Sequence, residues 1–226
     1  MPVTELAILP LTYVLTSSNP TLPTSIIEKF RTAKAALEHA SGYTFLYFQQ
    51  IEDPTIIYII GKWESAAAHR EFLPLKENLA LLELFKDDIV MQGEEGRKMA
   101  MWHLDADIFG LKPTRMGEKS VLRAPVISCN RYFIPANKKD DFVKKFSEVK
   151  GLLEDYTTPY PVMGGWRIEK ESIEGKERDE WVQISGFENV DHHMGFAKTE
   201  EFAKYREVVG LVEGFEVKHL KAIEGL

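Results

Sequence analysis

The sequence has almost no cysteine, no basic stretch and no long apolar run, and each absence excludes a class of protein. Cys129 is the single cysteine, which excludes an internal disulfide framework and a metal site built from several cysteines. The formal net charge is -7, and the lysines and arginines form no stripe, which argues against a nucleic-acid-binding surface. No apolar run approaches the roughly 20 residues that span a bilayer, and the first residues lack a signal-peptide pattern. We therefore expect a cytoplasmic protein with neither a nucleic-acid nor a membrane partner.

Several site motifs are also missing. The sequence contains no phosphate-binding loop, no dinucleotide-binding glycine pattern, no nucleophile elbow and no zinc-binding histidine motif. What it does contain is 44% hydrophobic and 28% charged residues, a balance typical of a globular protein with a real core. We expect no metal site and no obligatory cofactor.

An internal repeat is the most informative feature of the chain. Residues 63–72 and 187–196 share one pattern. Each begins with an aromatic residue, Glu, and then Ser or Asn; His follows four positions later, and Phe three positions after the His. Further along, residues 101–104 and 217–220 both end in His-Leu. Because the two matches come in the same order, they favour a tandem repeat.

The elements around these matches predict the same order in both halves. In the first half, Thr24 or Ser25 and then Ser65 are the predicted helix caps; in the second half, they are Asn137 and Asn189. The predicted strands are 5–15, 43–51, 55–63, 98–106, 126–134, 162–171, 180–187 and 215–222, with a polar loop at 172–179. The predicted helices are 24–40, one starting at 65, 76–86, 138–153, 189–197 and 200–212.

Two β-α-β-β-α-β units fit the ferredoxin-like motif, in which helices cover one face of an antiparallel sheet. The other face also needs cover, and packing the two sheets together supplies it within one chain. We therefore predict an α+β fold with a first half at 1–107, a linker at 108–124 and a second half at 125–226. These halves would form an intramolecular pseudo-dimeric α/β barrel, either as a monomer or paired again as a homodimer.

The segments 59–65 and 184–190, with His69 and His193, resemble the dimeric α/β-barrel superfamily. They look most like its antibiotic-biosynthesis-monooxygenase and stress-responsive A/B-barrel branches, here in a tandem form. The resemblance implies activities that include cofactor-independent monooxygenation or cyclisation of aromatic polyketides, and haem chemistry of the chlorite-dismutase-like kind. The plant-type cyclase branch has a His-Pro-x-His element that neither half contains.

The monooxygenase branch often places Asn, Trp and His around one cavity, and the second half supplies these types in Asn130, Trp166 and His193. The first half has no Asn in its opening strand. The resemblance therefore favours the second half as the catalytic one.

An imidazole with a pKa near neutral suits the deprotonation of an acidic phenol or a β-dicarbonyl carbon. A polar strand residue can then donate a hydrogen bond to the enolate oxygen. The alternative is that the histidines fix the packing between helix and sheet, and that the polar strand residues face solvent or a wet seam. The catalytic candidates are His193, His69, Asn130, Tyr132, His219 and His103.

Aromatic side chains on neighbouring strands can line a flat cavity, and Gly164 and Gly165 can let a ligand approach the backbone. The same aromatic residues can equally be ordinary core, and a surface ion pair is an alternative role for the arginine. The substrate-binding candidates are Trp166, Arg167, Tyr47, Tyr58, Trp63 and Trp102.

The leading hypothesis is an enzyme that oxygenates or cyclises an aromatic or polyketide-like substrate without a cofactor. A non-catalytic ligand-binding or stress-response module stays open. So does a haem protein, with a ligand among His69, His193, His103 and His219.

Overall fold

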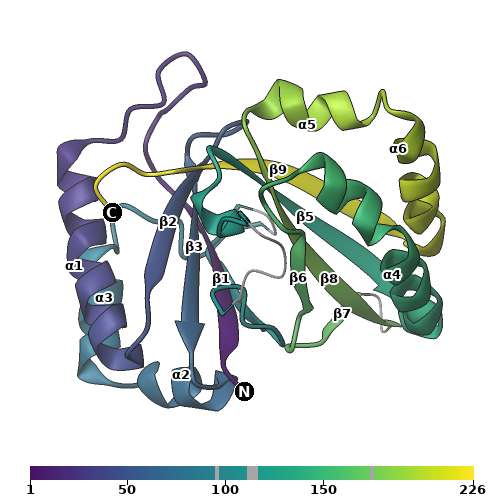
Figure 1. Ribbon diagram of the computed structural model, residues 1–226. Helices are drawn as coiled ribbons and strands as arrows, with labels where there is room; N and C mark the ends of the chain where they lie inside the picture. The colour runs from purple at the N-terminus through teal and green to yellow at the C-terminus, as the bar shows by residue number, and fades with distance from the viewer. Residues whose placement is uncertain (95–96, 111–116, 174–175) are drawn as a thin grey trace. The chain divides into compact units, whose positions relative to one another are not determined.

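The computed structural model describes residues 1–94, 97–110, 117–173 and 176–226, and the chain divides into two compact units. The first unit contains Met1–Asp107 and Leu220–Leu226, and the second contains Ile108–His219. Each unit has its own antiparallel strands and its own helices (Figure 1). Across the described ranges, no helix is long and apolar enough to cross a membrane.

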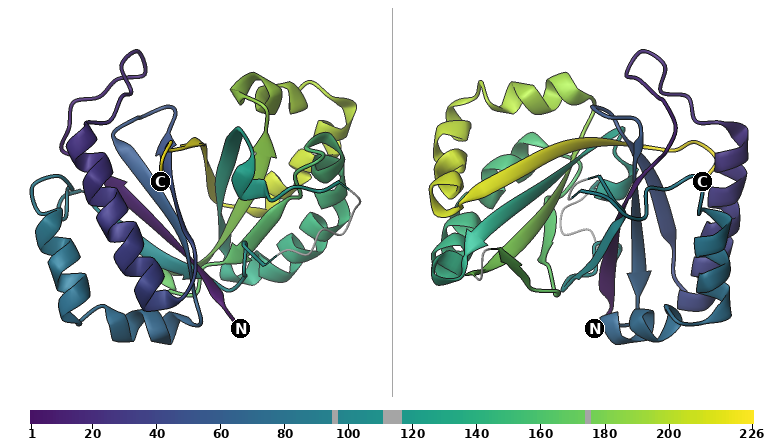
Figure 2. Two further views of the ribbon diagram at one scale, coloured as in Figure 1. Left: turned by 60° about the vertical axis from the view of Figure 1, so that its left-hand side comes forward. Right: turned by 180° about the vertical axis from the view of Figure 1, so that it is seen from behind.

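The first unit has four strands in the order β4-β1-β3-β2, and the end of β9 adds to the edge at β2. Helices α1 and α3 lie on one face of this sheet (Figure 2). The strands are β1 (Val3–Pro10), β2 (Phe45–Gln50), β3 (Ile56–Trp63) and β4 (Ala100–Leu104), and the helices are α1 (Thr24–Ser41), α2 (Ala66–Phe72) and α3 (Lys76–Leu84).

The core of the first unit follows from two periodicities. In α1, the buried residues recur at helical spacing and form one apolar face. In β1, alternate residues from Val3 to Leu9 point to the same face of the sheet. These two surfaces pack together and bury, among others, Ile26, Phe30 and Leu37.

The second unit repeats this arrangement with the strand order β9-β5-β8-β6, and β7 pairs with β8. Its strands are β5 (Val126–Pro135), β6 (Met163–Trp166), β7 (Glu171–Ile173), β8 (Lys176–Phe187) and β9 (Gly214–Ala222). Its helices are α4 (Lys139–Tyr156), α5 (Val190–Phe196) and α6 (Glu200–Tyr205), with short 3-10 helices η1 (Val121–Arg123), η2 (Ala136–Lys138) and η3 (Arg206–Leu211).

Two of the predicted helix caps are confirmed and two are wrong. The Ser65 side chain accepts a hydrogen bond from the Ala68 amide at 3.1 Å, and Asn189 does the same for His192 at 2.7 Å. In α1, however, the residue before the helix is Pro23, and no side chain caps the helix. The Pro23 carbonyl accepts hydrogen bonds from the amides of Ile26 and Ile27 at 3.1 and 3.2 Å, so Thr24 and Ser25 fall inside the first turn of the helix.

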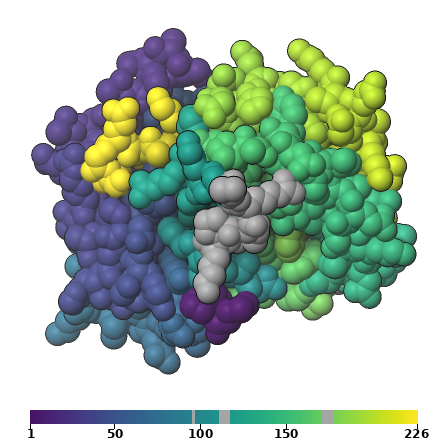
Figure 3. Space-filling view, in the orientation of Figure 1, coloured from purple at the N-terminus to yellow at the C-terminus, as the bar shows by residue number. Residues whose placement is uncertain are grey.

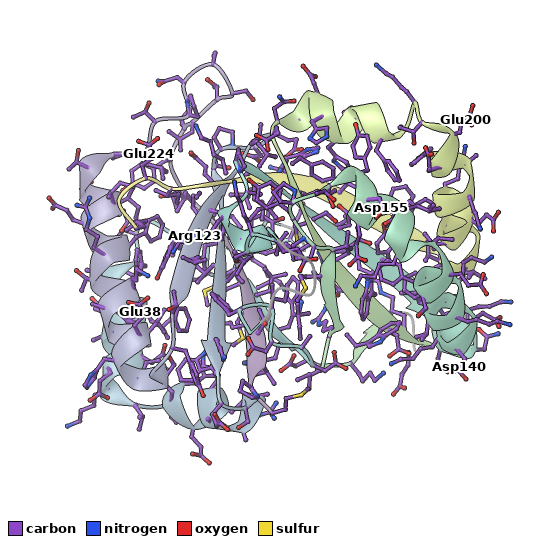
Figure 4. The ribbon with its side chains drawn as sticks, in the orientation of Figure 1. Glu38, Arg123, Asp140, Asp155, Glu200 and Glu224 are labelled. Carbon is purple, nitrogen blue, oxygen red and sulfur yellow. The ribbon has the colours of Figure 1, made fainter. Side chains whose placement is uncertain are left out.

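The start of α4 is the second correction. Asn137 lies within η2, and α4 begins at Lys139, so that Lys138 occupies the N-cap position. The 3-10 turn moves the helix start past Asn137, so that its side chain is one position too early to cap it. The first turn of α4 instead carries Asp140 and Asp141, whose charges suit the positive end of the helix dipole; Asp140 is labelled in Figure 4.

The predicted strand at 162–171 and the predicted loop at 172–179 are both wrong in part. The strand ends at Trp166, and the loop region instead forms a hairpin in which Glu171 is opposite Arg178 and Ser172 opposite Glu177. Residues 174–175 of the predicted loop, like 111–116 of the predicted linker, lie outside the described residues. The end of the linker segment contains η1, in which Val121 and Leu122 are buried.

The C-terminal residues complete the edge of the first unit. The Ile223 amide donates to the Tyr47 carbonyl at 3.0 Å, and Arg31 Nε donates to the Gly225 carbonyl at 3.3 Å. In Figure 3 the C-terminal residues, in yellow, lie against the purple surface of the first unit. The last segment of the chain is therefore part of the fold around β2.

Gly61 allows the closest aromatic packing in the first sheet. It lies opposite Phe45, and a Cβ atom at this position would be 2.1 Å from Cε1 of the Phe45 ring. Because Phe45 is fully buried, its ring has nowhere to move. We expect Gly61→Ala to lower the free energy of unfolding by about 1–3 kcal/mol, measured by urea denaturation.

The matched control is Gly151→Ala in the middle of α4, where no atom lies within 4 Å of the added methyl group. This variant should be at least as stable as the parent, by up to about 1 kcal/mol. Equal stability of both alanine variants would mean that the Phe45 ring is free to move.

Candidate functional site

A pocket lies in the first unit between the sheet and helices α1 and α3. Its empty volume is about 630 Å³, counted with its open mouth. The walls are apolar and include Phe30, Ile59 and three methionines, Met91, Met99 and Met101. Methionine side chains adapt readily to ligand shape. Four polar residues also contribute to the lining: Glu5, Tyr47, His69 and Asn78.

Glu5 is the charged group of this pocket. It lies on β1 between Val3 and Ala7 on the face that carries the helices, and it is 4% exposed. Its Oε2 atom accepts a hydrogen bond from Nε1 of Trp63 at 2.6 Å. Nδ1 of His69 lies 3.4 Å from the same oxygen. A carboxyl group is therefore held at the sheet end of a largely apolar space.

Burial changes the acidity of this carboxyl group. Loss of hydration raises the pKa of Glu5 from its ordinary value of 4.5 to about 7, while the hydrogen bond from Trp63 lowers it. Near neutral pH the group is therefore present in both its acid and its base form. Such a group can take a proton from a bound ligand and return it.

Two histidines extend this arrangement away from the carboxylate. Nδ1 of His69, on α2, lies 2.9 Å from Nε2 of His103, on β4. The His69 ring stacks on Trp63 with a centroid separation of 4.3 Å and an interplanar angle of 5°. Because each ring nitrogen's role depends on the tautomer, the pair can pass a proton or hold the rings in place.

The same histidine pair occurs in the second unit. Nδ1 of His193 lies 2.7 Å from Nε2 of His219, and the His193 ring stacks on Phe187 at 4.3 Å. The repeated sequence patterns thus correspond to one repeated structural feature, an aromatic residue that supports a pair of histidines.

The second unit has no carboxylate at the equivalent position. Val3 is opposite Trp63 and Val126 is opposite Phe187, so Ser128 occupies the place that corresponds to Glu5. The Ser128 hydroxyl donates to Asn130 Oδ1. The predicted oxyanion donor Asn130 is thus engaged in a buried network.

Side chains fill the space in the second unit that corresponds to the pocket. The Tyr205 hydroxyl donates to Gln183 Oε1 at 2.9 Å, and Gln183 donates to Ser185 at 3.1 Å. The predicted donor Tyr132 packs on Phe142 in the same core. The first unit has smaller or apolar groups in the positions that match Asn130, Tyr132 and Tyr205, namely Ala7, Leu9 and Leu81. Ala7, Leu9 and Leu81 line the pocket of the first unit, whereas larger or polar side chains occupy the matching positions in the described part of the second unit.

The other predicted binding residues are divided between the two faces of the sheets. Tyr47 lines the pocket, and Trp63 lies beneath His69. Strand alternation places Tyr58 and Trp102 on the opposite face, because their neighbours Ile59 and Met101 face the pocket.

In the second unit, Trp166 packs against Phe142 at 5.8 Å in the core. Arg167 lies on the other face, where Nη1 bonds Glu180 Oε2 at 3.0 Å. Arg131 bonds the same carboxylate through Nε at 2.6 Å. The predicted binding residues of the second half therefore serve its core and an ion-pair cluster.

The side chains around the pocket do not fit a haem group. Its lining residues include no lysine or arginine to pair with propionates, and they do include an acidic residue. His69 is 3% exposed, stacked on Trp63 and paired with His103. Among the residues that the structure describes, no group of three or more His, Cys, Asp or Glu side chains is placed to hold a metal ion.

The raised pKa of Glu5 predicts a pH-dependent stability. The folded state holds this proton more tightly than the unfolded state, so the stabilisation is fully present below pH 4.5 and is lost as the pH rises to about 7. We expect the free energy of unfolding to fall by about 3 kcal/mol across this window because of this group. Urea denaturation at a series of pH values measures it.

The control for this measurement is Glu5→Gln, which carries no titratable proton. The difference in the free energy of unfolding between parent and variant should change with pH between about 4.5 and 7 and be constant above that range. Parallel curves over the complete range would contradict a raised pKa.

Glu5 was missed by the sequence-based prediction, although a signal was available. It is the first residue of the predicted strand 5–15, and strand alternation places it on the same face as Ala7 and Leu9. Acidic residues are rarely buried without a function or a partner.

Comparison with known proteins supports the fold. No protein-family model matches the sequence, and no curated protein matches it. Solved structures do match. An anthrone oxidase-like protein superposes with a TM-score of 0.65 at 10% identity, over 99% of this chain and 92% of its own.

Two further structures cover almost the whole chain. A candidate monooxygenase from Fusobacterium nucleatum subsp. nucleatum ATCC 25586 matches with a TM-score of 0.62 at 8% identity, over 99% of this chain and 93% of its own. A chlorite dismutase variant from Candidatus Nitrospira defluvii matches with a TM-score of 0.52 at 10% identity, over 97% and 91%. At these identities the likeness concerns the fold alone. The chain shares with these structures an α+β fold made of two ferredoxin-like halves in one polypeptide.

Proposed function

We propose that the first unit is a cofactor-independent oxygenase of an apolar, fused-ring small molecule with an acidic C–H group, and that Glu5 is its general base. The observation that carries the proposal is the Glu5 carboxyl group, with its pKa raised to about 7, in a largely apolar pocket. A base works best when its pKa lies near the operating pH.

The proposed reaction converts a CH₂ group next to conjugated rings into a carbonyl group and uses one molecule of dioxygen. Glu5 takes one proton from carbon, and the resulting carbanion is delocalised into the rings. The carbanion transfers an electron to dioxygen, and the two radicals combine to give a peroxide, which takes up the proton from Glu5. Loss of the second C–H proton and cleavage of the O–O bond release water. Four electrons leave the carbon and reduce the two oxygen atoms, one of which stays in the product.

The surroundings of Glu5 support this chemistry. The apolar walls favour an uncharged aromatic ligand, and they exclude water from a reactive carbanion. His69 lies 3.4 Å from the carboxylate and 2.9 Å from His103. These two rings can therefore help to position the carboxylate between its proton transfers.

The names of two structural neighbours point in the same direction. One is called anthrone oxidase-like and another a candidate monooxygenase. The fold they share does not determine activity, so the proposal depends on the pocket.

The test is oxygen consumption by the purified protein with anthrone, a fused-ring ketone with an acidic CH₂ group. The expected result is consumption of one dioxygen per quinone formed, above the rate without protein. Rearrangement of a substrate without oxygen uptake would point to cyclisation instead. Binding of the probe without any conversion would contradict the proposal and leave a ligand-binding protein.

A further inference from the structure

The Tyr47 hydroxyl group is a buried donor whose hydrogen-bonding partner is missing. Tyr47 is 2% exposed and lines the pocket. Within the described parts of the chain, its hydroxyl oxygen has no hydrogen-bond partner. Leaving a buried hydroxyl unpaired costs about 1–3 kcal/mol, and such groups are rare in folded proteins. An unpaired group that lines a pocket therefore indicates a polar atom on the ligand.

The electrostatics around Tyr47 determine which kind of atom that is. Burial raises the pKa of Tyr47 far above its ordinary value of 10, and the negative charges of Glu5 and Glu38 raise it further. The phenol therefore keeps its proton at neutral pH. A neutral phenol donates well to a carbonyl oxygen, and better still to the same oxygen when it becomes an enolate.

The register of the sheet separates Tyr47 from the proposed base. Tyr47 on β2 is opposite Ile59 on β3, and Ile59 is opposite Ala7 on β1. Glu5 lies two residues further along β1, so the two polar groups stand two strands apart. A ligand that reaches both must carry its oxygen and its acidic C–H at separate places on the ring system.

We infer that Tyr47 is a specificity-determining residue, which holds a carbonyl oxygen of the ligand while Glu5 faces its acidic C–H group. This inference deepens the proposed function and rests on it for the role of Glu5. It selects uncharged ketones over hydrocarbons of the same shape. Ionised ligands are disfavoured because the lining residues offer no lysine or arginine and include an acidic group.

The second unit supports this assignment by contrast. The residue that corresponds to Tyr47 is Gly164, which is opposite Gln183 in the way that Tyr47 is opposite Ile59. In the second unit, the hydroxyl group of the buried Tyr205 donates to Gln183 at 2.9 Å. That phenol therefore has a partner within the protein, whereas the Tyr47 hydroxyl in the pocket has none among the described residues.

The experiment compares two probes that differ by one oxygen atom. Anthrone and 9,10-dihydroanthracene have the same three rings, and only anthrone has a carbonyl group. Binding is measured by calorimetry without oxygen, so that no turnover occurs. The parent protein should bind anthrone about tenfold more tightly or better, because a hydrogen bond to a buried hydroxyl that is otherwise unpaired stabilises the complex by that amount.

Tyr47→Phe should remove this preference and leave the affinity for dihydroanthracene unchanged. The unliganded variant should melt at the same temperature as the parent or higher, because an unpaired buried hydroxyl has been removed. Tyr58→Phe is the matched control, a buried tyrosine in the same sheet on the face away from the pocket. It should keep the preference.

The outcomes separate this inference from the proposed function. If Tyr47→Phe prefers anthrone as strongly as the parent does, or if the parent binds neither probe, the inference is wrong. If the preference depends on Tyr47 and anthrone is never oxidised, the inference stands and the oxygenase proposal fails. Undiminished oxidation of anthrone by Tyr47→Phe, with an unchanged KM, would leave the oxygenase and overturn the role of Tyr47.

Discussion

Replacing Glu5 with glutamine is expected to lower the rate of oxygen consumption by about a hundredfold or more. Glutamine preserves the size of the side chain, and its oxygen can still accept the hydrogen bond from Trp63 Nε1. What it lacks is the ability to take a proton, and a positioned general base contributes about 10²–10⁴ to a rate. The loss should appear in kcat, measured with an oxygen electrode under saturating substrate, and KM should change little.

The pH profile gives a second readout of the same variant. In the parent, kcat/KM should rise with pH and level off above about 7, because the base form of Glu5 grows over that range. The residual activity of Glu5→Gln should lack this rise. A full rate with Gln at position 5 would exclude this carboxylate as the base.

The repeated histidine pairs offer a matched control for the same experiment. His69→Gln should reduce turnover, because His69 lies beside Glu5 at the pocket. His193→Gln disturbs the equivalent pair in the second unit. It should leave the turnover per folded molecule unchanged. Equal losses in both variants would mean that the second unit also takes part in the reaction.

Replacing Glu180 with alanine is expected to have the largest effect on stability, a loss of about 3–5 kcal/mol. The Glu180 side chain is 1% exposed and is held by Arg131 at 2.6 Å and by Arg167 at 3.0 Å. The desolvation of these groups is offset by their mutual attraction. Removing the shared carboxylate leaves two mostly buried cations close together, with the half-exposed Glu216 still bonded to Arg131. Urea denaturation of the purified variant measures the loss.

The control is Glu207→Ala, which breaks an exposed ion pair with Lys145 at 3.0 Å. Exposed pairs contribute at most about 1 kcal/mol, so this variant should be close to the parent. A Glu180→Ala variant as stable as Glu207→Ala would mean that water reaches the two arginines and replaces the carboxylate.

The sequence predicted those parts of the fold that depend on local chemistry. Ser65 and Asn189 were recognised as caps because a short polar side chain before an apolar helical pattern has one common role. The predicted caps Thr24 and Asn137 failed because a proline and a 3-10 turn define the helix starts there. The residue at which a helix starts depends on the backbone geometry before it, and a cap pattern in the sequence does not predict that geometry.

The candidate site was only half predictable, for a different reason. The repeat of His69 and His193 identified the histidine pair that both units contain. A feature common to both units cannot indicate which of them holds a pocket. That difference lies in positions where the halves do not match, such as Glu5 against Ser128 and Ala7 against Asn130. Whether a small residue leaves a cavity depends on which side chains pack around it in the fold, and many of these are far away in the sequence. A short repeated pattern carries no information about them.

The place of Leu220–Leu226 in the first unit has a consequence for how this protein is made. Residues 220–222 pair with β2, which carries Tyr47, and the Ile223 amide bonds the Tyr47 carbonyl. On the ribosome, most of the first unit emerges before the second unit, but one edge of its sheet stays unpaired until residues 220–222 have been synthesised after the second unit. The half that holds the pocket is therefore completed only after the second unit has emerged, and until then the edge strand that carries Tyr47 is exposed.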